Sequence, residues 1–200
     1  MPLNYGQFGA KMTLNIPKID GLTEHQVLTL TRARKYKQYL SMIEDYKAGK
    51  CVFCDPLGEK NVVLVELDGW RMWENPFPED NTALHLVLAS VRHISTEELP
   101  SRHDFMSVGG LFEWAEVRYG DRLRGGGMLM RFGSPEYNAG TILHLHAHIM
   151  VPDLKGDVRL PLAKEPARIE LGYLRLRAYE KVRTGTPMTD LSDEERDVFE

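Results

Sequence analysis

Residues 141–152 read TILHLHAHIMVP, in which His144, His146 and His148 occupy every second position. Because successive side chains of a β-strand point to opposite faces of a sheet, this spacing predicts a strand with three imidazoles on one face. The apolar residues between them share the other face, which we expect to pack into the core. The chain holds only seven histidines, so three in strict alternation indicate a functional row of imidazoles more than a solvated strand face.

Four other segments are strand-like and three are helix-like, and together they set the fold class. The strand-like segments are 61–67, 70–75, 83–91 and 128–133. Asp68 and Gly69, between the first two, form the turn signal of a β-hairpin. The expected helices are 23–48, 95–119, with Pro100 as a point of interruption, and 165–183. Five strands joined largely as a meander, with helices at the ends and one between, predict a single α+β domain.

Three parts are expected along the chain. Residues 1–50 form an N-terminal helical extension, 51–185 the main domain, and 186–200 an acidic tail that we expect to be peripheral. The basic stretch RARKYK of the first helix is expected to be a solvated surface. The sequence contains no internal repeat and no low-complexity linker.

Composition and charge limit the partners. The chain has 42% hydrophobic and 27% charged residues, which is typical of a globular protein. A net charge of −4 argues against binding nucleic acid polymers, whereas a small phosphate ligand needs only local positive potential. No apolar run approaches the roughly 20 residues that span a bilayer, and no signal-peptide pattern is present. With two cysteines, a disulfide scaffold is not indicated. We expect a cytoplasmic protein without membrane partners.

Two kinds of chemistry fit a row of imidazoles. HxH on a strand is a familiar metal-ligand spacing, but an open catalytic zinc needs a further ligand, and no acidic residue follows the triplet until Asp153. Alternatively, neutral imidazole is a nucleophile towards phosphorus near pH 7. Its phosphoramidate is labile, so two easier steps replace one hard step.

The sequence HLHAHIM resembles the His-φ-His-φ-His-φ-φ signature of the histidine triad (HIT) superfamily of nucleotide hydrolases and transferases. CVFC is similar to the CxxC of its zinc-bearing bacterial members. ENPFPEDNTALHLVLASVRHI is similar to the segment in which an Asn/Asp-containing loop leads to GHLLVIPKxHI, and NAGTIL precedes the triad much as AGQSVxH does. The resemblance covers residues 51–152 and implies a HIT-like antiparallel five-stranded sheet with helices, to which the N-terminal helical extension is added.

The resemblance implies roles at the phosphate end of a site. By its place in the motif, His146 is the catalytic nucleophile, and His148 orients the phosphate or assists the leaving group. Thr141 matches the Ser/Thr whose hydroxyl and amide contact the phosphate. Gly140 allows close approach of the backbone. We therefore expect His148, Thr141 and Gly140 to bind the nucleotide.

The nucleoside end of the site is expected near the end of the second strand. By its place in the motif, Asn75 matches the residue that contacts the ribose, and Glu74 is the alternative candidate for that nucleotide-binding role. Trp73 and Phe77 are placed to flank a base, although aromatic residues at such positions more often belong to the core. We expect His85 to be a buried, hydrogen-bonded histidine.

Cys51 and Cys54 have two interpretations. A redox CxxC pair usually opens a helix in a βαβ setting, whereas a strand-rich region follows here. Two cysteines are also too few for an all-cysteine zinc site. In zinc-bearing triad proteins, the missing ligands are the histidine that ends the third strand and the first histidine of the triad. The resemblance thus implies a structural Zn²⁺ held by these cysteines with His93 and His144.

The resemblance implies an enzyme that cleaves at the α-phosphate of a nucleoside phosphate derivative through a nucleotidyl-histidine intermediate. It would be a hydrolase or transferase of the phosphoramidase, dinucleoside polyphosphate hydrolase or phosphorylase type. A purine nucleotide is the expected ligand, and a homodimer through residues 95–119 is expected. Two alternatives stay open: a zinc-stabilised nucleotide-binding module without turnover, and a mononuclear metallohydrolase that uses His144 and His146 as ligands.

Overall fold

Five antiparallel strands form a single sheet in the order β1-β2-β3-β5-β4. The structure is a computed structural model that describes residues 18–54, 62–94, 98–133, 140–159 and 166–199. The strands are β1 (Val65–Leu67), β2 (Trp70–Glu74), β3 (Thr82–Ser90), β4 (Gly127–Met130) and β5 (His146–Pro152). The sheet and the helices around it confirm the α+β class predicted from the sequence.

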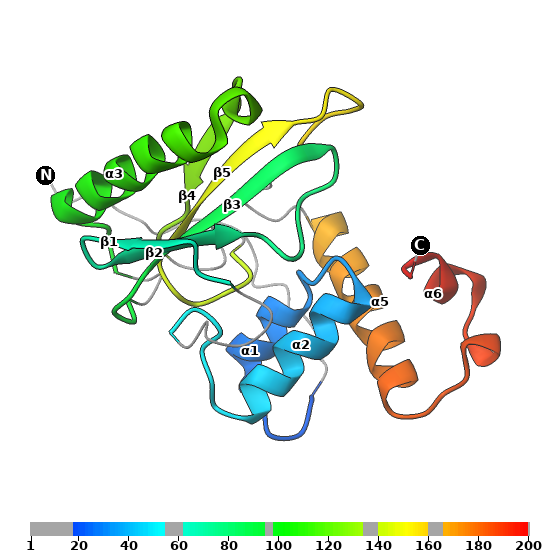
Figure 1. The fold of residues 1–200 in the computed structure, drawn as a ribbon. Helices are drawn as coiled ribbons and strands as arrows, with labels where there is room; N and C mark the ends of the chain where they lie inside the picture. Colours follow the sequence, from blue (N-terminus) through cyan, green and yellow to red (C-terminus); the bar gives the residue numbers. More distant parts are fainter. Residues whose placement is uncertain (1–17, 55–61, 95–97, 134–139, 160–165, 200) are drawn as a thin grey trace, which may run out of the picture.

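Helices lie on both sides of the sheet (Figure 1). They are α1 (Glu24–Leu30), α2 (Tyr36–Lys47), α3 (Arg102–Tyr119), α5 (Pro166–Arg183) and α6 (Asp193–Asp197), with the short 3-10 helices η1 (Gly120–Leu123) and η2 (Met188–Asp190). Helix α3 runs along one face of the sheet, whereas α1, α2 and α5 lie on the opposite side. Among the described residues, no helix is long and apolar enough to cross a membrane.

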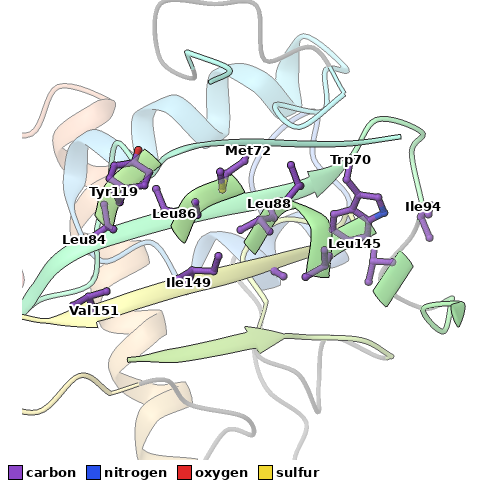
Figure 2. Packing of buried hydrophobic residues seen from close by; sticks show 14 residues of the cluster. Trp70, Met72, Leu84, Leu86, Leu88, Ile94, Tyr119, Leu145, Ile149 and Val151 are labelled. Atoms are coloured by element: carbon purple, nitrogen blue, oxygen red, sulfur yellow. The ribbon is translucent and has the colours of Figure 1, made fainter. Parts of the chain in front are cut away.

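The main apolar core lies between the sheet and α3. Leu145, Ala147 and Ile149 are buried there, as the alternation in the sequence predicts. They pack with Leu86 and Leu88 of the neighbouring strand β3. Figure 2 shows Leu86, Leu88, Leu145 and Ile149 gathered on one face. Because strand side chains alternate, the histidines of β5 point to the other face of the sheet.

Strand β5 begins at His146, later than the alternation alone predicts. The chain before it approaches the sheet in an irregular conformation. It is fixed where the Leu145 N–H donates to the carbonyl of Ile94 at 2.8 Å and the Ser90 N–H donates to the Leu145 carbonyl at 3.3 Å. His144 therefore lies ahead of the regular strand, where its ring can face a different group from the histidines that follow.

The hairpin between β1 and β2 turns at Asp68 and Gly69, as predicted. These residues have φ values of 48° and 76°, and a two-residue turn with both φ values positive matches the twist of the flanking strands. The resulting register pairs β2 with β3 so that Trp73 lies opposite Val87 on the histidine face of the sheet.

Helix α3 begins after Pro100 and not at the predicted position 95. Ser101 caps it: the Ser101 hydroxyl accepts from the Asp104 N–H at 3.3 Å, and the Asp104 carboxylate accepts from the Ser101 N–H at 2.7 Å. This reciprocal pair satisfies backbone groups that the first turn leaves open. Residues 95–97 lie outside the described part of the chain, and 98–101 are not helical.

The single helix predicted for residues 23–48 is two helices, α1 and α2. The Thr29 hydroxyl donates to the Gln26 carbonyl at 2.7 Å, and the Thr31 hydroxyl donates to the Leu28 carbonyl at 2.7 Å. Such side chains offer the backbone an alternative to continued helical hydrogen bonding. Thr31 forms the C-cap of α1, and the chain changes direction after it.

Helices α1, α2 and α5 share a second core with the C-terminal residues. The Phe199 ring centroid lies 5.4 Å from that of Tyr36 and 4.9 Å from that of Tyr179. The Tyr179 hydroxyl donates to the Val198 carbonyl at 3.1 Å. The prediction of a peripheral tail is therefore wrong, because the apolar end of the tail packs on these helices.

Helix α5 passes close to the junction of α1 and α2 at Gly172. A Cβ atom there would lie 2.9 Å from the carbonyl oxygen of Thr31. Gly to Ala in a helix normally adds about 0.5–1 kcal/mol of stability, but the overlap makes Gly172→Ala destabilising by about 1 kcal/mol or more. The matched control is Gly109→Ala in α3, where nothing lies within 4 Å and stability should rise. Urea denaturation measures both, and a stabilised Gly172→Ala would contradict the close contact.

Candidate functional site

A cleft lies on the histidine face of the sheet, between strands β2, β3 and β5 and helix α2. Its empty volume is about 750 Å³, part of it open to solvent. Its polar lining includes Arg34, Asn75, Arg131, Thr141, His146 and His148. The cleft thus brings together residues from distant parts of the sequence, with basic and hydrogen-bonding groups facing one space.

His146 is almost fully buried, and its ring is held by the backbone carbonyl of His144. Its Nδ1 lies 2.5 Å from the carbonyl oxygen of His144, so Nδ1 carries the hydrogen and donates it. The neutral ring keeps its lone pair on Nε2. Burial, with a contribution from nearby Arg131, lowers the pKa of His146 to about 4, so the ring is neutral near pH 7.

A chain of hydrogen bonds sets the tautomer of His148. The Glu79 backbone N–H donates to His85 Nδ1 at 3.0 Å, so neutral His85 carries its hydrogen on Nε2. His85 Nε2 donates to His148 Nδ1 at 2.9 Å, which leaves the hydrogen of His148 on Nε2. Burial lowers the pKa of His85 to about 4 and holds the pKa of His148 well below its usual value. The expectation that His85 is buried and hydrogen-bonded is confirmed.

Cys51, Cys54, His93 and His144 form a cluster beside the cleft. One ligand atom from each residue lies within 4.8 Å of the other three. The Sγ of Cys54 is 3.1 Å from His93 Nδ1, and both sulfurs are 3.4 Å from His144 Nδ1. The structure brings together the four residues that the resemblance connects with a metal.

The donor set of this cluster fits Zn²⁺. The Nε2–H of His144 donates to the Ser90 carbonyl at 2.7 Å, which leaves the Nδ1 lone pair facing the sulfurs. Metal-binding histidines are typically oriented by such an outer hydrogen bond. Two thiolates and two imidazoles match a tetrahedral structural zinc site. Burial and neighbouring Cys51 raise the pKa of Cys54 to about 11, and a bound cation would offset this cost of forming the thiolate.

Asn75 and Glu74 lie on opposite sides of the sheet, because consecutive side chains at the end of a strand alternate. Asn75 lines the cleft: its Oδ1 accepts from the Phe77 N–H at 2.9 Å, and its amide nitrogen lies 3.2 Å from His85 Nε2. Glu74 is on the α3 side, where it accepts from the Tyr119 hydroxyl at 2.9 Å. Of the two residues predicted for the ribose, Asn75 alone is among those that line the cleft.

Gly140 and Thr141 are anchored by the N-terminal helical segment. The Arg32 guanidinium donates to the Gly140 carbonyl, and the Tyr46 hydroxyl donates to the Thr141 carbonyl at 3.4 Å. Thr141 lines the cleft with the histidines. The segment that leads into the triad therefore takes its position partly from residues that lie far ahead of it in the chain.

The two aromatic residues predicted near a base differ in their surroundings. Trp73 is completely buried and packs in a small cluster with Phe53 and Val87. Phe77 is half-buried and lines the cleft. Trp73 therefore belongs to the core and also lines the cleft, whereas Phe77 is the more accessible of the two to a ligand.

Arg32 and Arg34 turn inwards, so the prediction of a solvated RARKYK surface is wrong for both. Their guanidinium groups donate to the carbonyls of Gly140 and Phe77, respectively. The break between α1 and α2 causes this orientation. Because the break depends on hydroxyl-to-backbone hydrogen bonds, helical periodicity could not reveal it.

Arg131 also lines the cleft and was not predicted. The register of β4 with β5 pairs Leu129 with His148 and Met130 with Ala147. Arg131, one residue further on, comes level with His146 on the same face. Alternation along this strand, combined with its pairing, could have identified it.

Two solved structures show what the chain is similar to. A hypothetical histidine triad nucleotide-binding protein from Sulfolobus tokodaii strain7 matches at 16% identity and a TM-score of 0.40, over 68% of this chain and 97% of that chain. A Zn-bound histidine triad family protein from Mycobacterium smegmatis matches at 22% identity and a TM-score of 0.39, over 70% and 99%. No protein-family model and no curated protein matches the sequence. The chemistry of the cleft is therefore inferred from its own residues.

The hydrogen-bond pattern predicts the tautomer of each histidine in the cleft. We expect His146 to be protonated on Nδ1, and His85 and His148 on Nε2, at neutral pH. Long-range ¹H–¹⁵N correlation spectra of the imidazole rings distinguish the two forms directly. Protonation of His146 on Nε2 would contradict the hydrogen bond to the carbonyl of His144 and remove the free lone pair from the cleft.

Proposed function

We propose that this protein is a histidine-triad-type nucleotide hydrolase or nucleotidyl transferase, which cleaves a nucleoside phosphate derivative at its α-phosphorus. The observation that carries the proposal is the tautomer of His146, whose Nδ1–H is bound by the His144 carbonyl at 2.5 Å. The lone pair on Nε2 belongs to a neutral ring that lines the cleft. Such an imidazole can attack phosphorus without first losing a proton.

In the first step, His146 Nε2 attacks the α-phosphorus. A phosphorus–nitrogen bond forms as the bond from phosphorus to the leaving group breaks. The Nε2–H of His148 donates a hydrogen bond to the leaving atom, which takes up the bonding electron pair and departs as an anion. The hydrogen bonds from Glu79 through His85 support this role, because they keep the hydrogen of His148 on Nε2.

In the second step, an acceptor oxygen attacks the same phosphorus. The phosphorus–nitrogen bond breaks, its electron pair returns to Nε2 of His146, and any proton carried by the acceptor oxygen is released to solvent. Water as the acceptor gives hydrolysis, whereas phosphate or a sugar phosphate gives phosphorolysis or transfer. Thr141 and Gly140 would hold the non-bridging oxygens, where charge grows as the reaction proceeds. Asn75 would contact the ribose of a purine nucleotide.

We infer that Cys51, Cys54, His93 and His144 hold a structural Zn²⁺. Bound there, the cation would neutralise both thiolates and tie the CxxC segment to the sheet. The four protein ligands would complete a tetrahedral shell and leave no position for a reacting water. All catalytic steps are therefore assigned to side chains of the chain itself.

The geometry favours this proposal over a mononuclear metallohydrolase. His144 directs its Nδ1 to the cysteines, whereas His146 has its Nδ1 engaged by a carbonyl and its Nε2 at the cleft. The two rings therefore serve different centres. Turnover by the wild-type protein distinguishes the proposed enzyme from a module that binds a nucleotide without converting it.

The homodimer remains part of the proposal. Helix α3 exposes Phe105, Met106 and Val117, which are 56%, 63% and 89% accessible. A second copy that covered these side chains would remove apolar surface from water.

His146→Asn should abolish turnover of a fluorogenic AMP ester or AMP phosphoramidate, because the nucleophile is lost. His148→Asn should retain turnover lowered by about 10²–10³-fold, since a donor to the leaving group contributes only part of the rate enhancement. Intact-mass spectrometry of the wild-type protein mixed rapidly with substrate should detect one added nucleotidyl group.

The matched control is His103→Asn, since His103 is exposed on α3 at the far side of the sheet. It should be as active as the wild-type protein. If His146→Asn keeps more than a few per cent of wild-type turnover, the nucleophile is misassigned. If the wild-type protein binds AMP but turns over no member of the substrate panel, the non-catalytic module is the better description.

The zinc inference predicts close to one zinc ion per purified chain, measured by inductively coupled plasma mass spectrometry. Cys54→Ser should lower both the zinc content and the melting temperature, because metal binding free energy is partly folding free energy. His103→Asn again serves as the control and should change neither. A metal-free chain with reduced thiols, whose melting temperature is unaffected by a chelator, would rule the site out.

A further inference from the structure

Arg131 is a buried cation for which the described part of the chain provides no counter-ion. Arg131 is 7% exposed, and it lines the cleft at the same level along the strands as His146. Within the described ranges, its side chain has no ion-pair or hydrogen-bond partner, and its Nε is both buried and unbonded. Burial lowers the pKa of Arg131, and no carboxylate among the described residues acts against that effect. Such a charge opposes folding unless something pairs with it.

Two more arginines from the junction of α1 and α2 lie at the cleft. Arg34 lines it together with Arg131, and Arg32 contacts the Gly140 carbonyl, next to the cleft-lining Thr141. The Arg131 charge contributes, after burial, to lowering the pKa of both. Arg34 forms an ion pair with Glu79, and Arg32 contacts the Gly140 carbonyl. Neither contact supplies a carboxylate to Arg131.

The histidines near Arg131 add no negative charge. The Arg131 charge contributes to lowering the pKa of His85, His146 and His148, which favours the neutral form of each ring. Asp45 also lines the cleft, but it is not among the groups that shift the pKa of Arg131. An anion in the cleft would therefore find a guanidinium already desolvated and held in place, a favourable arrangement for charge-assisted hydrogen bonds to phosphate oxygens.

We propose that Arg131, flanked by Arg32 and Arg34, forms a second oxyanion site that binds a phosphate group other than the α-phosphate attacked by His146. The inference rests on the proposed function for the position of the α-phosphate. The second phosphate has two sources: the phosphate adjoining the α-phosphate in a nucleoside polyphosphate, or free inorganic phosphate held as the acceptor. In both cases the recognised chemistry is a phosphate anion on a guanidinium.

The first experiment compares the stability of wild-type protein and Arg131→Met in phosphate-free buffer. Methionine fills a similar space without charge, so the melting temperature of the variant should equal or exceed that of the wild-type protein. Adding millimolar inorganic phosphate should raise the melting temperature of the wild-type protein and leave that of the variant unchanged. A variant that melts lower, with no loss of phosphate response, would overturn the proposal.

The second experiment is calorimetry with AMP and with α,β-methylene-ADP, which cannot be cleaved at the α-phosphorus. If the leaving group supplies the second phosphate, wild-type protein should bind the diphosphate analogue about tenfold more tightly than AMP, and Arg131→Met should lose that preference. Arg131→Lys should keep part of it, because the charge remains. Arg102→Gln, at an exposed position on α3, removes the same charge and should behave as wild type.

If free phosphate is the source, AMP and inorganic phosphate should bind together, and the phosphate should be lost in Arg131→Met. Either result supports the second site. The proposal is wrong if neither the preference for the diphosphate nor phosphate binding depends on Arg131, while AMP binding and His146-dependent turnover persist. If no nucleotide binds, yet phosphate still stabilises the wild-type protein alone, the nucleotide assignment fails and the oxyanion site stands.

Discussion

His144 holds the cysteine–histidine cluster and the histidines of the cleft in a fixed relation. Its ring donates from Nε2 to the Ser90 carbonyl and directs Nδ1 to the cysteine sulfurs. Its own carbonyl accepts the Nδ1–H of His146. One residue thus directs a ring nitrogen to the proposed metal site and selects the tautomer of the proposed nucleophile. Any rotation of this peptide would disturb both, so the irregular approach to β5 is as important to the site as the strand itself.

The alternation of the histidine triplet was sufficient to predict which side of β5 faces the core. That is because a period of two is a geometric property of any strand and needs no knowledge of its neighbours. The hairpin at Asp68 and Gly69 was predictable for a similar reason, since the turn requires two residues that tolerate positive φ. The cysteine–histidine cluster was different. Contacts from Cys54 span 39 residues to His93 and 90 to His144, and only the resemblance pointed to these partners.

The arginines of the cleft were missed for physical reasons that differ from one another. Arg32 and Arg34 face inwards because α1 ends at Thr31, and that end depends on hydroxyl groups that bind the preceding turn. Helical periodicity assumes that the helix continues. Arg131 follows a strand whose pairing with β5 is set by tertiary structure. The sequence identifies its face only once the partner strand and the register are known.

The junction between α1 and α2 is held by the C-terminal half of the chain. The Arg175 side chain donates to the Ala33 carbonyl at 3.2 Å, and the Tyr179 hydroxyl donates to the Arg34 carbonyl at 3.2 Å. The stretch from residue 51 to residue 152 carries every motif by which the chain resembles a known family, yet it contains neither side of this junction. The segment that can be recognised is thus smaller than the unit that shapes the cleft. A fragment cut to those limits would keep the histidines and lose one wall of positive charge.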